Sequence, residues 1–238
     1  MEFARKGFDF AAGEIIIINK PAGLTSFQVV KKIKSRFEIK KVGHTGTLDP
    51  LATGVLLILT GKATRQSQAL ANLDKQYVAE VEFGIETDTL DVEGKVVSHC
   101  DHLREFHRAE ILNLLEQFTG EIEQIPPIYS AIKVNGMPLY KYARRGVLVE
   151  PQPRQVRIDS IRLIAVNWPV IQIDVTCSKG TYIRSLARDL GAKLGTGAHL
   201  KSLIRTRIGT YHIENAFDLE NFLRIGVVKT GDESTATR

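Results

Sequence analysis

The sequence has few cysteines and no long apolar runs. It contains only two cysteines, Cys100 and Cys177, and they form no C-x-x-C motif. A disulfide framework is therefore not expected, and a reducing compartment suits the chain. The longest apolar runs, at residues 15–18 and 55–59, are far shorter than the ~20 residues that cross a bilayer. The start of the chain has no apolar stretch of signal-peptide length, so we expect a cytoplasmic protein that does not enter a membrane.

The composition is that of one sizeable domain. Of the 238 residues, 43% are hydrophobic, which is enough to bury a substantial core without disulfides or metal ions. Lys and Arg outnumber Asp and Glu by 32 to 27. This small excess of positive charge suits an anionic partner, although many soluble enzymes are equally basic.

Local patterns predict strands and helices in an irregular order. Short β-branched or alternating runs predict strands at residues 14–19, 77–83 and 171–177. Helices are predicted where apolar residues recur at helical spacing next to a start or stop signal. The first follows a capping box at Thr25-Ser26-Phe27-Gln28 and has apolar residues at Val30, Ile33 and Phe37. The second has apolar residues at Ile111, Leu112, Leu115 and Phe118 and is closed by Gly120, and the third runs from Ile183 to Leu194 before Gly195. Because no βα unit repeats, we expect an α+β fold with a largely antiparallel mixed sheet flanked by helices.

Residues 124–154 differ in composition from the rest of the chain. They hold five of the eight prolines, and Lys and Arg are interleaved there with tyrosines. A connection this long and irregular is usually functional or mobile. Basic residues mixed with aromatic ones favour a flap that closes on RNA, and a tolerated surface insertion is the alternative.

One carboxylate stands alone in a glycine-rich loop at residues 43–54. Asp49 is the only acid between Glu38 and Asp74, and the apolar run of residues 55–59 follows the loop directly. Pro50 disfavours a helical backbone at Asp49, so we expect an extended loop and a side chain with a defined direction. The alternative is an Asx turn, in which Asp49 only accepts hydrogen bonds from its own backbone.

Ordered motifs along most of the chain resemble those of the TruB family of tRNA pseudouridine synthases. The resemblance extends from about residue 13 to about residue 220. It rests on the following blocks in order: Asn19-Lys20-Pro21-Ala22-Gly23, GHTGTLDPLATGVL from Gly43, Asp74-Lys75-Gln76-Tyr77, Thr87-Asp88-Thr89-Leu90-Asp91, Gln124-Ile125-Pro126-Pro127, Tyr140-Lys141-Tyr142-Ala143-Arg144, and Cys177-Ser178-Lys179-Gly180-Thr181-Tyr182-Ile183-Arg184. A single motif of this kind would be weak evidence, but several in order are strong.

The resemblance implies a function and a domain organisation. It implies a pseudouridine synthase catalytic domain at residues 1–228, in which residues 124–154 form a thumb that grips RNA, and a polar tail at residues 229–238. The implied reaction is isomerisation of uridine-55 in the T loop of tRNA, with an accessory role in tRNA folding as a further expectation. Relatives often continue into a C-terminal PUA domain, which we do not expect here. A monomer is the default expectation.

The resemblance also assigns roles to residues of the reaction centre. Asp49 matches the catalytic aspartate, and Arg184 matches the arginine that pairs with it and would keep it ionised. Asp91 matches an acid that holds Arg184. Tyr77 and Tyr182 match residues that flank the target base, with Tyr77 as the expected general base. Without the resemblance, the two tyrosines would be read as core residues.

Further residues are expected to contact the RNA or to support the loop. His44 matches the residue that fills the position vacated by a flipped-out base, and Leu203 matches an apolar contact to that base. Arg205 is expected to contact a phosphate, as are Arg207 and the basic positions of residues 31–36. Lys20, grouped here with the substrate-binding residues, is expected to support the catalytic loop from behind.

The implied reaction gains and loses no atoms, so we expect neither a cofactor nor a metal ion. Two other functions are weighed. Asp49 and Asp91 would be a glycosidase pair if their carboxyl groups stood about 5–9 Å apart. A non-catalytic module that binds the T arm of tRNA is the other alternative. Two weaker readings, a phosphate-binding loop at residues 61–64 and a metal site formed by His99, Cys100 and their neighbours, lack the spacing that those sites require.

Overall fold

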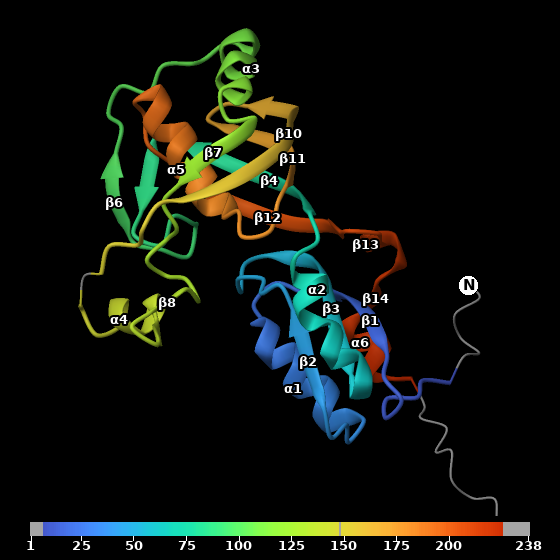
Figure 1. Ribbon diagram of the computed structural model, residues 1–238. Helices are drawn as coiled ribbons and strands as arrows, with labels where there is room; N and C mark the ends of the chain where they lie inside the picture. The colour runs from blue at the N-terminus through green and yellow to red at the C-terminus, as the bar shows by residue number, and fades with distance from the viewer. Residues whose placement is uncertain (1–6, 148, 226–238) are drawn as a thin grey trace, which may run out of the picture.

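The computed structural model describes residues 7–147 and 149–225 (Figure 1). Its central feature is a mixed 10-stranded sheet with the order β14-β1-β3-β12-β4-β11-β10-β7, in which β2 also pairs with β3 and β13 with β12. Only the β1–β14 and β3–β12 pairs within this sheet are parallel. The predicted α+β fold with a largely antiparallel sheet is therefore confirmed.

The strands are β1 (Ile15–Lys20), β2 (Val42–Thr45), β3 (Thr53–Thr60), β4 (Lys75–Phe83), β5 (Ile85–Thr87), β6 (Val96–His99), β7 (Gly120–Gln124), β8 (Lys133–Val134), β9 (Met137–Pro138), β10 (Arg154–Asn167), β11 (Val170–Cys177), β12 (Ala198–Ile208), β13 (Tyr211–His212) and β14 (Phe217–Asp218). The α-helices are α1 (Ser26–Arg36), α2 (Ser67–Ala71), α3 (Arg108–Glu116), α4 (Leu139–Ala143), α5 (Ile183–Leu194) and α6 (Leu219–Leu223). Two 3₁₀ helices, η2 (Gly61–Gln66) and η3 (Ile213–Asn215), complete the elements of the described residues.

The sheet has two halves with separate hydrophobic cores. In the upper half of Figure 1, α3 and α5 pack against β4, β10, β11 and β12 around one large apolar cluster. β4 buries every second residue, as expected for a strand with one covered face. In the lower half, α1 and α6 cover one face of β1 and β3, while α2 lies against the other face. β3 is therefore buried on both faces, which explains why its sequence is continuously apolar.

Local signals predicted two helix ends correctly. Thr25 caps α1, because its side chain accepts a hydrogen bond from the Gln28 amide while the Gln28 side chain accepts one from the Thr25 amide. α5 ends at Leu194, and Gly195 follows it with a φ of 71°, the left-handed conformation that glycine adopts without strain.

Two local predictions were wrong. The helix near residue 111 ends at Glu116, its buried positions include Leu114 instead of Leu112, and Gly120 begins β7 rather than closing the helix. The segment expected to be a loop from residue 43 begins as a strand, because Gly43-His44-Thr45 in β2 pair with Leu57, Ile58 and Leu59 of β3. This pairing joins β2 to the next strand across the Asp49 loop, so the composition of residues 43–45 alone does not reveal it.

The chain leaves the sheet after β7 and returns to it at β10; the described residues between these strands, 125–147 and 149–153, are called the 125–153 segment below. They contain the short β8–β9 hairpin and α4, which lie apart from the main sheet at the lower left of Figure 1. The sequence marks residues 124–154 by their composition, and their extent and role as an RNA-gripping thumb stay predictions. The predicted polar tail at residues 229–238 lies outside the described residues.

Candidate active site

A cleft of about 610 Å³ lies between the two halves of the sheet. One side is formed by the loop at residues 46–50, and the other by the start of α5 with parts of β4 and β12. Tyr129, Tyr140 and Arg144 of the 125–153 segment also line it. The volume falls within the usual range for small-molecule sites, so one nucleoside can be enclosed here.

The loop that carries Asp49 is held by buried polar side chains. The Lys20 ammonium, with none of the residue exposed, donates to the carbonyl oxygens of Pro21, Leu24 and Pro50 at 2.8, 2.6 and 3.2 Å. Ser26 accepts a hydrogen bond from the Leu48 amide and donates one to the Leu48 carbonyl. These contacts fix the backbone on both sides of Asp49 and place its carboxylate in the cleft.

Lys20 supports this loop instead of reaching a substrate. Because its ammonium is buried and shared among three carbonyl oxygens, direct binding of a substrate does not fit, while the expected support from behind does. Burial lowers the pKa of Lys20 to about 8, against the opposing charge of Asp49.

Arg184 lies in the first turn of α5 and faces Asp49 across the cleft. Its Nε is 2.9 Å from an Asp49 carboxylate oxygen, and only 5% of the arginine side chain is exposed. The other guanidinium nitrogens donate to the carbonyls of Thr89 and Tyr129 at 2.8 and 2.9 Å. A planar guanidinium can make all of these contacts at once, so the orientation of Arg184 is strongly restricted.

Asp91 completes the charged cluster. One of its oxygens lies 3.5 Å from Arg184, and the other accepts hydrogen bonds from the Thr89 hydroxyl and the Glu93 amide. The Asp91 side chain is only 6% exposed. The structure thus brings together Asp49, Arg184 and Asp91, the proximity that the family resemblance implied.

The pKa of Asp49 is shifted upward. Burial raises the pKa, whereas the positive charge of Arg184 lowers it and the negative charge of Asp91 raises it further. Arg184 acts in the expected direction, towards the ionised form, while the loss of hydration is the larger effect on the pKa. That Arg184 keeps Asp49 ionised stays a prediction. The carboxylate still keeps 35% of its side-chain surface exposed, facing the cleft.

Tyr77, Tyr182 and Leu203 line the cleft around this cluster. Tyr77 is on β4 and is buried, and its burial raises the pKa of the phenol, which the charge of nearby Arg205 opposes. Tyr182 precedes α5, and its amide and carbonyl form hydrogen bonds to the Gln124 side chain at 2.8 and 3.1 Å. Leu203 contributes an apolar surface from β12.

Arg205 has a structural setting that the sequence did not suggest. Only 1% of the residue is exposed, and its guanidinium donates to the carbonyls of Val55 and Gly46 at 2.8 Å each. The expected phosphate contact does not fit this placement, because both contacts tie β12 to the two ends of the Asp49 loop. Arg205 therefore positions the loop while its side chain borders the cleft.

His44 does not border the cleft. It lies on β2, its Nδ1 is buried without a hydrogen-bond partner among the described residues, and burial lowers the pKa of the imidazole. Its role in filling the position of a flipped base stays a prediction.

Sequence reasoning assigned no role to two other titratable residues at the cleft, Lys75 and Glu93. Lys75 is buried, and its ammonium donates to the carbonyls of Ala71 and Leu73. Burial lowers the pKa of Lys75 to about 8, and burial together with Asp91 and Asp49 raises the pKa of Glu93. The signal that could have found them is their position relative to the assigned residues. Lys75 shares one face of β4 with Tyr77, and Glu93 lies two residues after Asp91.

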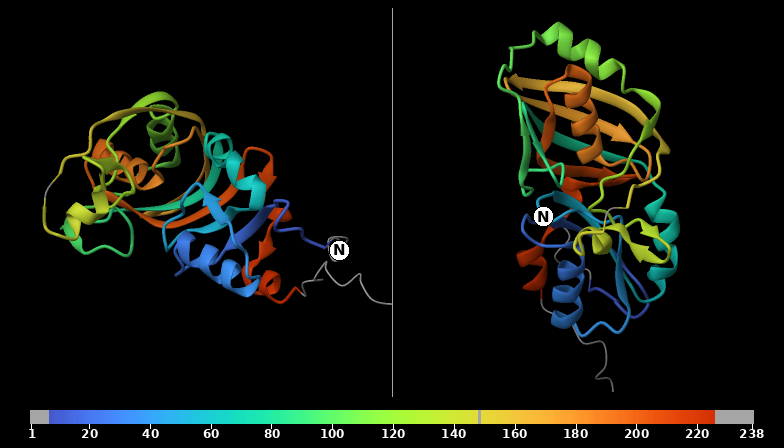
Figure 2. Two further views of the ribbon diagram at one scale, coloured as in Figure 1. Left: turned by 60° about the horizontal axis from the view of Figure 1, so that its bottom comes forward. Right: turned by 90° about the vertical axis from the view of Figure 1, so that its left-hand side faces the viewer.

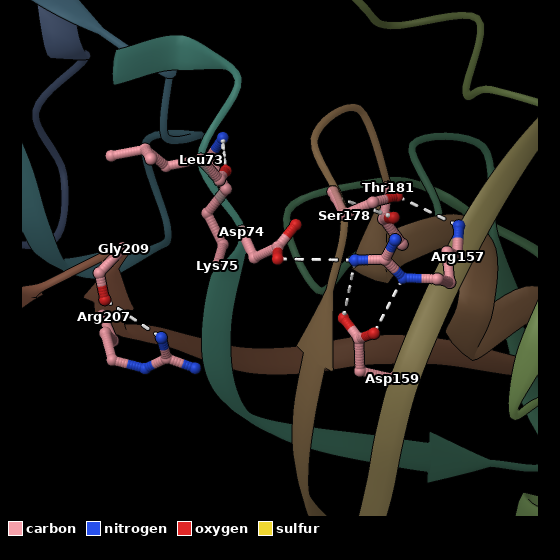
Figure 3. A network of polar contacts seen from close by, with 9 residues as sticks. All are labelled: Leu73, Asp74, Lys75, Arg157, Asp159, Ser178, Thr181, Arg207 and Gly209. Carbon is pink, nitrogen blue, oxygen red and sulfur yellow. Dashed lines mark hydrogen bonds and ion pairs between the residues drawn. The ribbon is translucent and has the colours of Figure 1, made fainter. Parts of the chain in front are cut away.

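A polar network next to the cleft fixes the turn that precedes α5. Figure 3 shows Arg157 of β10 between the carboxylates of Asp159 and Asp74, at 2.7 and 3.4 Å. The Arg157 backbone exchanges hydrogen bonds with Ser178, whose carbonyl accepts one from the Thr181 hydroxyl. The network therefore joins β4, β10 and the turn that presents Arg184.

Solved structures share this fold. The chain superimposes on one chain of "Crystal Structure of a Cbf5-Nop10-Gar1 Complex" with a TM-score of 0.69 and 30% identity, covering 90% of this chain and 54% of that one. For "Structure of H/ACA RNP bound to a substrate RNA containing 2'-deoxyuridine", the TM-score is 0.67 at 28% identity, covering 93% of this chain and 60% of that one. This protein thus spans little more than half of those chains.

Sequence comparisons identify the family. Residues 34–183 match the TruB family pseudouridylate synthase N-terminal domain, and residues 184–237 match the tRNA pseudouridylate synthase B C-terminal domain. Proteins named tRNA pseudouridine synthase B from Francisella philomiragia and Dehalococcoides mccartyi are each 48% identical, over 87% and 86% of this chain and 68% of their own. The family models and the fold define a pseudouridylate synthase domain. The chain belongs to the TruB family.

None of the helices in residues 7–147 and 149–225 is both long and apolar enough to cross a membrane.

Proposed function

We propose that this protein isomerises uridine in tRNA to pseudouridine, with Asp49 as the catalytic carboxylate. The observation that carries the proposal is the 2.9 Å pair between Asp49 and buried Arg184, both of which line a nucleoside-sized cleft. Tyr77, Tyr182 and Leu203 border the same space and offer flat or apolar surfaces to a pyrimidine. The names of the relatives support tRNA as the substrate.

The reaction needs one well-placed carboxylate. The N1–C1′ bond breaks, the uracil turns, and a C5–C1′ bond forms; C5 then loses its proton and N1 ends protonated, so atoms and electrons balance. Asp49 can attack C1′, add to C6, or assist removal of the C2′ proton, and each route uses an ionised carboxylate as nucleophile or base. The proposal covers these three routes equally.

The surrounding residues adjust the properties of Asp49. Arg184 orients the carboxylate and opposes the upward shift of its pKa, so that more of it is ionised at neutral pH. Tyr77 is proposed as the base that removes the C5 proton. Burial of the phenol works against this role, and the adjacent Arg205 works in its favour by lowering the pKa.

The finer details of the proposal follow from the family resemblance. The target is uridine-55 in the T loop, and the uridine flips out of the RNA stack to enter the cleft. The segment at residues 125–153 closes over the RNA, supported by the positions of Tyr129, Tyr140 and Arg144 at the cleft. We extend the proposal to a cytoplasmic monomer that uses the T stem-loop of tRNA as its partner.

The two alternative functions fit the site less well. A glycosidase pair needs a second carboxyl group that is free to act on water or on the leaving oxygen. Asp91 is buried, and its oxygens are taken up by Arg184, Thr89 and Glu93, which suits a supporting role. A module that only binds RNA gains nothing from a desolvated carboxylate at its binding cleft, because the charge repels phosphates and its burial is costly.

The test is incubation of the protein with an unmodified tRNA transcript, followed by site-specific mapping of pseudouridine. The expected result is pseudouridine at the T-loop position with the wild-type protein and none with Asp49→Asn, which should still bind the tRNA. Tight tRNA binding without any pseudouridine would favour the binding module. Activity close to wild type in Asp49→Asn would contradict the proposed catalytic role of this residue.

A further inference from the structure

The exposed face of α1 has an unusual composition for a helix on the surface of a protein. Phe27 is 70% exposed, more than any other large apolar residue in the described part of the chain. Between Ser26 and Arg36 the helix carries Lys31, Lys32, Lys34 and Arg36 and no acid. The positions 27, 31 and 34 follow helical spacing, so Phe27 and two lysines form one stripe along the helix.

This stripe begins at the rim of the cleft. Thr25, the cap of α1, lines the cleft, and Ser26 is hydrogen-bonded to both backbone groups of Leu48, the residue before Asp49. In the right-hand view of Figure 2, α1 lies below α4 and the β8–β9 hairpin on the side that faces the viewer. The start of α1 is thus tied to the catalytic loop, on the side where the 125–153 segment also lies.

The basic residues of the stripe are available to a partner. Lys31 and Lys34 form no ion pair with any residue that the structure describes, and both are exposed. Lys32 has only a long contact to Glu220, at 3.9 Å between two exposed side chains. Beside the stripe, a shallow groove is lined by Gln28, Lys31, Lys32 and Arg36, and Arg36 is held there by the Leu223 carbonyl at 2.8 Å.

These features favour RNA over a protein as the occupant. A protein interface usually has a continuous apolar centre with few charges. Here one aromatic ring is surrounded by cations, the combination by which proteins bind unpaired nucleic acid through stacking and phosphate contacts. The helical rise of ~1.5 Å per residue puts Lys34 about 10 Å from Phe27 along the helix. That length matches about three stacked nucleotides at ~3.4 Å each.

We propose that the face of α1 formed by Phe27, Lys31 and Lys34 is an RNA contact surface, on which Phe27 stacks against an unpaired base next to the target uridine and the two lysines bind phosphates of the same strand. This inference rests on the proposed function, because the cleft beside it must receive RNA. It adds a surface outside the cleft that sets RNA affinity without taking part in bond making or breaking.

The first test measures binding of the full chain to an unmodified tRNA transcript over a series of salt concentrations. Phe27→Ala should raise Kd about tenfold, since one stacked base accounts for roughly that change. The double variant Lys31→Gln/Lys34→Gln should lower the slope of log K against log salt by about 1 to 2, because each phosphate contact on a single strand contributes ~0.7. For both variants kcat at saturating tRNA should stay at the wild-type value while KM rises.

Matched controls come from the opposite end of the molecule. Leu112→Ala removes an exposed apolar side chain from α3, and Lys193→Gln removes an exposed charge from α5. Both should leave Kd and the salt slope unchanged. If Phe27→Ala and the double lysine variant behave like these controls, the proposal is overturned. A change in oligomeric state with unchanged tRNA binding would also overturn it and would make the face a protein interface.

A second measurement places the contact. A photo-crosslinking amino acid at position 27 should attach to a nucleotide adjacent to the target uridine, and attachment to a distant arm of the tRNA or to no nucleotide would contradict the proposal. Binding and crosslinking test this inference, whereas pseudouridine formation tests the proposed function. A wild-type protein that binds tRNA but forms no pseudouridine would refute the function, while the binding and crosslinking results would still decide the role of α1.

Discussion

The centre around Asp49 and the 125–153 segment are built in different ways. The Asp49 side, meaning the Asp49 loop and the buried cations that contact it, includes Lys20, Arg184 and Arg205, and most of their polar contacts are to backbone carbonyls. In contrast, the 125–153 segment touches this centre through a few points, among them the Tyr129 carbonyl that accepts from Arg184 and the Ile125 carbonyl that accepts from Ser185. Several of its apolar residues, such as Ile125 and Val147, are 45% and 47% exposed.

The difference indicates that the Asp49 side and the 125–153 segment have different functions within the site. Buried cations that hold backbone carbonyls keep the reacting groups in one geometry, which a catalytic centre needs. A segment with few buried contacts can adapt to a large ligand at low cost in free energy. Changes on the Asp49 side should therefore alter kcat, and changes in the 125–153 segment should alter KM or Kd.

Arg184→Lys should have the largest effect of the predictions that follow. Lysine keeps the charge but cannot contact Asp49 and the Thr89 and Tyr129 carbonyls together, so kcat should fall by roughly 100-fold while Kd for tRNA changes little. Single-turnover rates and equilibrium binding would measure the two quantities. Arg188→Lys, four residues further along α5, is the matched control and should keep nearly full kcat. If Arg184→Lys changed Kd without changing kcat, Arg184 would contribute to tRNA binding and not to the catalytic geometry.

Gly54→Ala should disturb the Asp49 side through its backbone. Gly54 has a φ of 101°, and a Cβ there would lie 2.2 Å from the Arg205 carbonyl oxygen. We expect a loss of roughly 3 kcal/mol in the free energy of unfolding, from steric strain where β3 meets β12.

Denaturant unfolding of Gly54→Ala and Gly23→Ala would test this prediction. Gly23 also has a positive φ, but nothing lies within 4 Å of its Cβ position, so its variant should lose only about 1 kcal/mol. Equal losses for the two variants would show that the close approach to Arg205 is not the cause.

The pH dependence of kcat should reflect the raised pKa of Asp49. The carboxylate must be ionised to act, so kcat should decrease as the pH falls through this pKa. Because burial raises the pKa, the decrease should begin above the range of an ordinary aspartate, whose pKa is ~3.9. The measurement is kcat at saturating tRNA across acidic to neutral pH, with folding followed in parallel. A rate that stays constant down to the ordinary range would contradict the raised pKa.

Arg144→Gln should have the smallest effect. Arg144 lines the cleft from the 125–153 segment and is exposed. Loss of one exposed phosphate contact should raise KM several-fold, leave kcat unchanged and reduce the salt slope of binding by ~1. Arg108→Gln, on distant α3, is the control and should change neither quantity. A large decrease in kcat would mean that this segment belongs to the catalytic geometry.

The amino-acid sequence by itself determined those features that depend on neighbours along the chain or on ordered motifs. The capping box at Thr25 and the end of α5 at Gly195 were readable because their signals are local. The family was readable because its motifs occur in order. The roles and mutual contacts of Asp49, Asp91 and Arg184 were implied by the resemblance alone, and their roles stay predictions.

Only the tertiary structure decided the features that depend on strand pairing and on burial. β2 exists because β3 offers a partner for Gly43-His44-Thr45, and Arg205 is a buried support because β12 runs beside the two ends of the Asp49 loop. The raised pKa of Asp49 likewise follows from the depth at which two halves of the fold bury it. Hydration, strand pairing and burial are properties of the folded chain, so they cannot be predicted from residue types and their spacing alone.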